Sequence, residues 1–273
     1  AIAATMLNGA IRTSEQEEMA HLLRRKSQLM IAYGSCAHTG GVPALANQFS
    51  REQVMRFVYH ECPSVVNPEG TEPLTEFHDR GRVATLPAFR NVVRSLDQVV
   101  DVDYYLPGCA PNPELVLAAI RAVLSGDLPP KGTVLAPDIA LCDTCPRIGT
   151  KPADLEVDRY YRPHQKVADP DVCLLAQGFL CLGPATRSGC GERCIRGNMP
   201  CTGCFGPLSG VRDHGAKALS AMASILAAKD DAGIEEALTG IPDPVGSFYR
   251  YGLAHSMIRR RVDLTPRPET ADV

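Results

Sequence analysis

Cysteine is the residue type with the most chemical potential in this chain of 273 residues, which contains eleven of them. The stretch CGERCIRGNMPCTGC places four of them within fifteen residues: Cys190, Cys194, Cys201 and Cys204. Four more precede it, in LCDTCP and CLLAQGFLC: Cys142, Cys145, Cys173 and Cys181. Thiols at such spacings form disulfides or bind zinc or iron–sulfur clusters.

The spacing of these eight cysteines favours iron–sulfur clusters and leaves zinc and disulfides as alternatives. Eight is twice the four ligands of a structural zinc or a 4Fe–4S cluster. Zinc sites commonly use two C-x-x-C knuckles, and Cys142/Cys145 with Cys201/Cys204 would leave the other four cysteines without a knuckle. A disulfide scaffold is less expected, because the cysteine count is odd and the chain has apolar residues enough for its own core.

The simplest grouping of the eight follows the sequence order and gives two sites of four thiols. One site would consist of Cys142, Cys145, Cys173 and Cys181, and the other of Cys190, Cys194, Cys201 and Cys204. Ligation can interleave in proteins with two clusters, so this grouping is a hypothesis.

The elements that must position these residues change in character along the chain. Residues 2–6 and 29–33 are short apolar runs typical of buried strands, and 99–106 is a further strand candidate. A capping box at Ser14–Glu17 predicts a helix start, and residues 113–126 read as an amphipathic helix from Pro113 to Gly126. This alternation predicts an α/β fold with an open, mostly parallel sheet.

Two further cysteines, Cys36 in YGSC and Cys109 in PGC, follow predicted strands. Ligands of open α/β sheets lie beyond the carboxyl ends of the strands, so both thiols could face one site. Taken singly, each could instead be a small buried core residue.

Beyond residue 130 the sequence is rich in Gly, Pro and Cys, and helical periodicity returns only after residue 210, notably over 216–228. We therefore expect two domains, an α/β domain over 1–130 and a cysteine-rich, loop-dominated domain over 131–273 with C-terminal helices. The second domain would be held together by its metal sites as well as by apolar packing.

Composition excludes several functions. Lys and Arg number 28 against 31 Asp and Glu, so no nucleic-acid footprint is expected, and the run Arg259–Arg261 reads as a solvated or interface face. No apolar stretch approaches the ~20 residues of a transmembrane helix. P-loop, Rossmann, HExxH and GxSxG motifs are absent from the sequence, so no independent catalytic centre is expected.

Taken in order, YGSCAHTGGVPAL, LPGCAPNPE, LCDTCPR, QGFLCLGPATRSGC and PCTGCFGP resemble the small subunit of nickel–iron hydrogenases. The resemblance extends from about residue 2 to about residue 215. It is strongest to the cytoplasmic methyl-viologen-reducing type that feeds heterodisulfide reductase. It implies a flavodoxin-like first domain and an electron-transfer role, with hydrogen split in a partner large subunit that carries the nickel–iron centre.

The resemblance also implies three 4Fe–4S clusters. Cys36 and Cys109 match two ligands of a proximal cluster. The distal cluster would be held by Cys142, Cys145, Cys173 and Cys181, and the medial one by Cys190, Cys194, Cys201 and Cys204. Relatives that lack a residue like Cys194 hold a 3Fe–4S cluster there, so this fourth thiol implies 4Fe–4S.

The partners implied are the large subunit, a small iron–sulfur acceptor subunit and a flavin-containing heterodisulfide reductase, all in the cytoplasm. One alternative is the small subunit of a deazaflavin- or NAD-reducing hydrogenase, which differs in its acceptor. An alternative of another class is a zinc-stabilised interaction module without redox function.

The sequence departs from the family pattern at two places. The N-terminal C-x-x-C of the proximal site is absent, and because the chain begins with Ala1 in an apparent strand, we expect that motif upstream in a longer chain. Asn8 stands where relatives often have Glu, which puts a proton-relay role there in doubt.

Five other residues have open interpretations. Cys62 matches no ligand motif and reads as an ordinary thiol, whereas His38 could lie near the proximal cluster or on the surface. Arg187, Arg193 and Arg196 could offset the charge of the medial cluster or be solvated.

Overall fold

The computed structural model describes residues 2–258, so the basic run Arg259–Arg261 lies outside the described residues. Three strands form a parallel sheet in the order β1 (Ile2–Asn8), β3 (Ser27–Tyr33) and β7 (Tyr104–Leu106). The predicted open, parallel α/β sheet is therefore confirmed. Within the described range, no helix combines the length and apolarity needed to span a lipid bilayer.

Helices cover both faces of this sheet because alternate residues of β3 point to opposite sides. Met30 and Ala32 share a core cluster with Ala20 of α1 (Ser14–Lys26). Ile31, between them, lies in another cluster with Ala119 of α4 (Pro113–Ser125). The central strand is thus buried on both faces, as its continuous apolar sequence predicts.

Helix α4 ends as predicted at Gly126, which adopts the left-handed conformation of a C-cap. The start of α1 differs from its prediction by one residue. Thr13, and not Ser14, is the N-cap, and its hydroxyl accepts from the N–H of Gln16 at 3.3 Å, while the Gln16 side chain accepts from the N–H of Thr13 at 2.9 Å.

The strand predicted over 99–106 is wrong in its first half, since β7 begins only at Tyr104. The chain before it is occupied by Asp103, whose carboxylate accepts from the N–H of Met30 at 2.7 Å and pairs with Arg24 at 2.6 Å. A side chain thus replaces the backbone pairing that a longer strand would make with β3.

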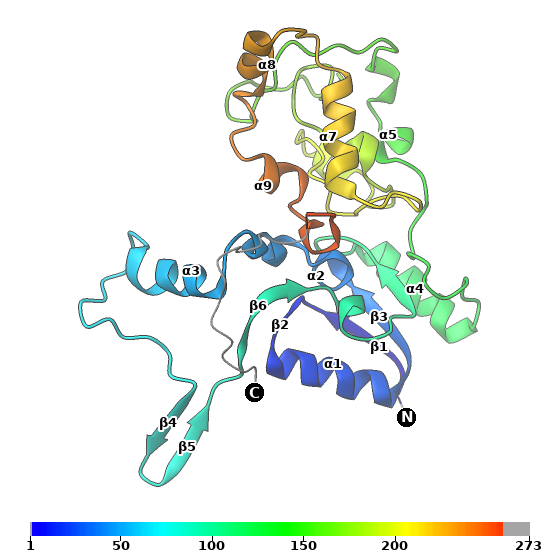
Figure 1. Cartoon of the computed structure of the whole chain (residues 1–273). Helices are drawn as coiled ribbons and strands as arrows, with labels where there is room; N and C mark the ends of the chain where they lie inside the picture. Colours follow the sequence, from blue (N-terminus) through cyan, green and yellow to red (C-terminus); the bar gives the residue numbers. More distant parts are fainter. Residues whose placement is uncertain (1, 259–273) are drawn as a thin grey trace.

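The sequence between the sheet strands contains elements that the periodicity did not predict. Strand β2 (Ile11–Thr13) pairs antiparallel with β6 (Phe89–Arg94), and α2 (Gly34–Thr39) follows β3 directly. Between α2 and β6, residues 51–88 extend away from the body of the molecule (Figure 1), and we call them the arm. The arm comprises α3 (Arg51–Arg56), one π-helical turn (Phe57–Glu61) and the hairpin β4 (Glu76–Asp79) and β5 (Arg82–Thr85).

The cysteine-rich half consists of long loops and short helices. Its helices are α5 (Leu141–Thr144), α6 (Arg193–Arg196), α7 (His214–Ser224), α8 (Asp231–Leu238) and α9 (Pro244–Phe248). The 3-10 turns of the chain are η1 (Val42–Gln48), η3 (Leu96–Gln98), η4 (Ile148–Thr150), η5 (Gly183–Ala185) and η6 (Leu253–His255). The helix predicted over 216–228 is α7, which begins earlier and ends four residues sooner.

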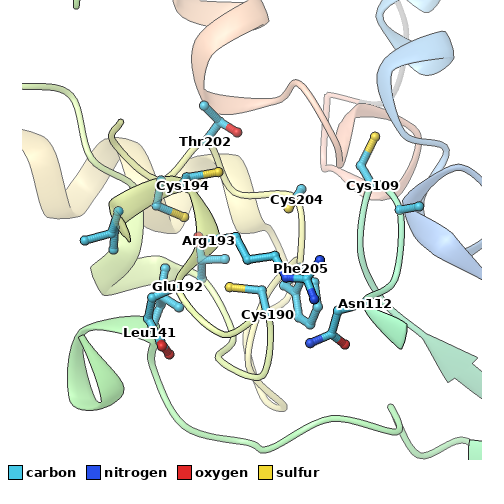
Figure 2. A pocket seen from close by; sticks show the side chains of 14 residues that line it. Cys109, Asn112, Leu141, Cys190, Glu192, Arg193, Cys194, Thr202, Cys204 and Phe205 are labelled. Atoms are coloured by element: carbon cyan, nitrogen blue, oxygen red, sulfur yellow. The ribbon is translucent and has the colours of Figure 1, made fainter. Parts of the chain in front are cut away.

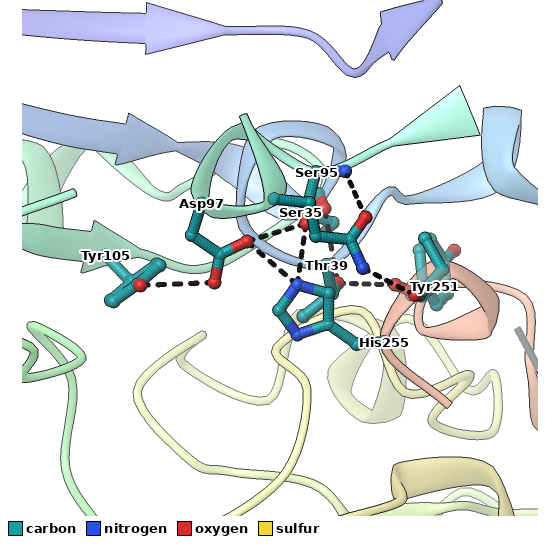
Figure 3. A network of polar contacts seen from close by, with 9 residues as sticks. Ser35, Thr39, Ser95, Asp97, Tyr105, Tyr251 and His255 are labelled. Atoms are coloured by element: carbon teal, nitrogen blue, oxygen red, sulfur yellow. Dashed lines mark hydrogen bonds and ion pairs between the residues drawn. The ribbon is translucent and has the colours of Figure 1, made fainter. Parts of the chain in front are cut away.

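A polar network fastens the end of the described chain to the sheet (Figure 3). The Nε2 atom of His255 lies 2.6 Å from the Ser95 hydroxyl and 2.9 Å from Asp97, and the Tyr105 hydroxyl donates to the same carboxylate. Burial alone would raise the pKa of Asp97, but the hydrogen bonds from His255, Ser95 and Tyr105 together lower it. The two halves of the chain therefore share a hydrogen-bonded junction.

Candidate metal centres

The first group of four cysteines lines one small cavity, which we call the 142–181 cavity. Its thiols belong to Cys142, Cys145, Cys173 and Cys181, and its volume is about 20 Å³. Cys142 sits in α5 and Cys145 directly after it, so a single helical turn presents both thiols of the C-x-x-C knuckle. The structure thus gathers the four residues that sequence order assigned to one site.

Gly183 forms part of the wall of this cavity and leaves little room for a side chain. A Cβ atom there would lie 3.2 Å from the sulfur of Cys142 and 3.7 Å from that of Cys181. The backbone N–H of Cys201 donates to the Cys181 sulfur at 3.4 Å. The cavity therefore offers close backbone approach and an N–H donor at sulfur, as a buried iron–sulfur cluster requires.

The second group of four lines a larger cavity of about 140 Å³, which we call the 190–204 cavity (Figure 2). Its thiols belong to Cys190, Cys194, Cys201 and Cys204. The turn that separates the first two uses positive φ angles at Gly191 and Glu192, after which α6 carries Cys194. This turn folds the two thiols back toward one space.

Cys109 lines the 190–204 cavity as well, which sequence order did not predict. Its charge is one cause, after burial, of the raised pKa of Cys36, so these two thiols lie close enough to interact. Ser35 donates its hydroxyl to the carbonyl of Cys204 at 2.7 Å and ties the neighbourhood of Cys36 to the same loop. The predicted proximal pair and the predicted medial group are therefore neighbours.

Burial makes these thiols reluctant to ionise in the chain by itself. It raises the pKa of Cys142 to about 12 and that of Cys204 to about 11, with nearby cysteine charges adding to the effect. A cationic metal group bound by these residues would displace their protons and supply the charge that burial disfavours. An all-thiol donor set around two cavities fits iron–sulfur clusters.

The thiols are spread around the cavity walls. All eleven cysteines are free. Across residues 2–258, no three His, Cys, Asp or Glu side chains converge closely enough to hold a single metal ion.

Two buried charged residues at the cavities were not predicted from the sequence. Arg147, in the 142–181 cavity wall, donates to the carbonyl of Ile195 at 2.9 Å and to the Asn198 side chain at 3.0 Å, which ties the two cysteine loops together. Glu192, in the 190–204 cavity wall, accepts from the Thr144 hydroxyl at 2.7 Å. Their position beside cysteines in CPR and CGERC was the only available signal.

The arginines near the 190–204 cavity differ from one another. Arg187 is only 2% exposed, so it is not solvated, and it pairs with Asp138 at 2.8 Å and with backbone carbonyls. Arg193 lines the cavity and pairs with Glu114. Arg196 pairs with Glu192 at 3.7 Å, so its charge opposes a carboxylate at the cavity wall.

The remaining candidates lie outside both cavities. The ring of His38 packs on Tyr105 with 4.8 Å between centroids, and burial lowers its pKa to about 4, so it is not a plain surface histidine. Cys62 lies in the arm, 3.2 Å from the Ser64 hydroxyl. Asn8 accepts from the N–H of Gly9 within its own turn.

Comparison with known proteins gives one family model, described as NADH ubiquinone oxidoreductase, 20 Kd subunit, which matches residues 2–123. The iron–sulfur subunit of the F420-non-reducing hydrogenase of Archaeoglobus profundus is 36% identical, over 94% of this chain and 80% of the relative. The corresponding vhu subunit of the F420-non-reducing hydrogenase of Methanocaldococcus jannaschii is 34% identical, over 94% and 79%. The delta subunit of the NAD-reducing hydrogenase HoxS of Cupriavidus necator is 27% identical, over 45% and 57%.

Solved structures give weaker likenesses. The [NiFeSe] hydrogenase of Desulfovibrio vulgaris Hildenborough has a TM-score of 0.43 and 17% identity, over 75% of this chain and 70% of the other. An NAD+-reducing [NiFe]-hydrogenase has a TM-score of 0.40 and 29% identity, over 45% and 65%.

Proposed function

This chain belongs to the family of iron–sulfur subunits of F420-non-reducing hydrogenases, small subunits of nickel–iron hydrogenases, and from that premise we propose how it transfers electrons. The observation that carries the proposal is the pair of cavities, each lined by four thiols. A large subunit that holds the nickel–iron centre is the partner that this family implies. The chain relays electrons from that partner through three 4Fe–4S clusters to a downstream acceptor.

An iron–sulfur cluster, when bound, supplies a one-electron carrier whose potential depends on its surroundings. The chain itself fixes positions, excludes water and places N–H groups at the ligand sulfurs. Cys181 and Cys201 are 7% and 6% exposed and belong to the same apolar core as Phe179 and Ile195. Such burial keeps bulk water away from the thiol sites.

The proposed ligand sets follow the cavities. The distal set is Cys142, Cys145, Cys173 and Cys181, and the medial set is Cys190, Cys194, Cys201 and Cys204. Cys36 and Cys109 are proposed proximal ligands, and a 4Fe–4S cluster there requires two further ligands beyond this pair.

We also propose a domain boundary near residue 130. The core cluster of the cysteine-rich half draws its buried residues from 141–248, whereas the clusters on the sheet draw theirs from residues up to 119. Leu135 still packs against the sheet, so the linker runs along the first domain before the second begins.

The proposed acceptor is a small iron–sulfur subunit leading to heterodisulfide reductase, in the cytoplasm. Relatives named as F420-non-reducing favour an acceptor other than deazaflavin. The rival of another class is a zinc-stabilised interaction module, which the same cavities could accommodate.

The test measures iron, acid-labile sulfide and zinc in the complex purified without oxygen, for wild type, Cys194→Ala and Cys62→Ala. We expect a brown protein, and Cys194→Ala should lose about one iron atom per chain, because a site with three thiolates holds three irons. Cys62 lines neither cavity, so Cys62→Ala should match wild type. A colourless protein with zinc in place of iron and sulfide would overturn the proposed function.

A further inference from the structure

The two thiol cavities are joined by a reciprocal pair of hydrogen bonds in the protein backbone. The N–H of Leu182 donates to the carbonyl of Cys201 at 2.9 Å. The N–H of Cys201 donates in the opposite direction, to the sulfur of Cys181, at 3.4 Å. All three residues are buried, so water does not compete for either bond.

These bonds connect ligands that the proposed function assigns to different clusters. Cys181 lines the 142–181 cavity, whereas Cys201 lines the 190–204 cavity. The path from one sulfur to the other runs through Sγ, Cβ, Cα and N–H of Cys201 and then across a single hydrogen bond. Electronic coupling decays more slowly along bonds than across empty space, so this path is the short bonded connection between the two sites.

We propose that the peptide N–H of Cys201, held by Leu182, is the electron crossing between the medial and distal sites. This inference rests on the proposed function and names the route within it. One electron leaves the group held by the 190–204 cysteines, which is oxidised. The same electron reaches the group held by the 142–181 cysteines, which is reduced, and no atom or proton moves between them.

The hydrogen bond also has a direction, which matters for electron flow. An N–H that donates to a ligand sulfur stabilises negative charge on it and so favours the reduced state of the attached cluster. The donor here belongs to the medial ligand and the acceptor to the distal one. The crossing therefore favours an electron on the distal side.

The backbone around Leu182 is fixed by η5, which keeps the crossing in place. The carbonyl of Leu182 accepts from the Thr186 hydroxyl at 2.6 Å and from the N–H of Ala185 at 3.1 Å. Leu182 itself lies just before η5 with a φ of −83°, an angle that proline also adopts. Proline at this position removes the N–H that holds Cys201 while remaining compatible with the local φ.

The test compares Leu182→Pro with Leu182→Ala in the purified, cluster-loaded complex. Both variants lose the leucine side chain, but only Leu182→Pro loses the N–H donor. EPR of the fully reduced complex at two frequencies separates the exchange coupling between the two clusters from the dipolar coupling. We expect Leu182→Pro to lose most of the exchange coupling while Leu182→Ala retains it, with iron content equal in both.

Equal exchange coupling in the two variants would overturn the crossing. If Leu182→Pro does not accumulate, an experimental structure of the loaded wild-type complex decides the matter. A Cys201 nitrogen beyond hydrogen-bonding distance of the Cys181 sulfur would overturn the inference, and the reciprocal pair would support it. Failure of the proposed function is distinguishable, because the complex would then contain no clusters to couple.

Discussion

At the scale of single residues, Gly183 illustrates how closely the backbone approaches the candidate ligands. It needs no unusual φ angle, so the reason for glycine there is space and not conformation. Its nearest neighbours are the sulfurs of Cys142 and Cys181, which any Cβ would press upon.

We expect Gly183→Ala to reduce the iron held at the 142–181 cavity, because crowding in a packed site costs about 1–3 kcal/mol. Gly149→Ala is a matched control, since a Cβ at Gly149 meets nothing within 4 Å. Iron and sulfide content of the two purified variants provides the measurement. Full iron in both variants would show that the cavity wall can yield.

His214 is a second informative residue, because burial lowers its pKa to about 4. It is the first residue of α7 and lies against Thr186, behind the 190–204 cavity. The unfolded chain binds a proton to this histidine near pH 6.5, whereas the folded chain binds it only near pH 4.

Its contribution to the free energy of unfolding is therefore fully present above about pH 6.5 and is lost as the pH falls toward 4. We expect the unfolding midpoint of wild type to fall with acid across this window, and that of His214→Gln to fall less. The ceiling of the difference is about 3 kcal/mol. Parallel pH profiles of thermal unfolding in the two proteins would contradict the assignment.

At the scale of elements, Asp103 connects three segments that are distant in sequence. Its carboxylate accepts from the N–H of Met30 in β3, pairs with Arg24 in α1 and pairs with Lys131 at 2.6 Å. Burial alone would raise the pKa of Asp103, but these partners lower it to about 2.

We expect Asp103→Asn to destabilise the chain by about 3 kcal/mol, because it leaves the buried partners of the carboxylate uncompensated. Asp101→Asn is the matched control, since this neighbouring side chain is exposed. Urea unfolding followed by circular dichroism measures both. A similar midpoint for the two variants would show that Asp103 is not the connection.

Which elements the sequence could predict depends on the range of the interactions that form them. The strand around Met30 and the helix from Pro113 are dictated by local apolar pattern and caps, and both were predicted. The early end of β7 depends on Asp103 meeting a strand 73 residues away in the chain, which no local pattern carries. The grouping of thiols followed from spacing, whereas the place of Cys109 beside Cys204 needed the fold.

At the scale of the whole molecule, the arm differs from everything around it. None of its residues, 51–88, is buried, and Val66 is 93% exposed. An isolated two-stranded hairpin is at best marginally stable in water. No periodic signal predicted the arm, because its apolar residues are scattered among charges and turns.

We expect limited trypsin digestion of the isolated chain to cut first in the arm, at Arg80 and Arg82 beside the hairpin turn. Exposed backbone with few tertiary contacts opens most easily to a protease. Mass spectrometry of the early fragments identifies the sites. First cuts in the cysteine-rich half would mean that its loops, without their metal groups, are the less stable part.

The arm has a consequence for how such a protein is made in the cell. A newly synthesised chain would display Val66, Phe77 and Val83 to every other chain in its surroundings until something covers them. Large exposed apolar patches promote aggregation and recognition by quality-control proteases. Synthesis of this subunit should therefore be timed with that of whatever shelters the arm, and an unaccompanied surplus would be short-lived.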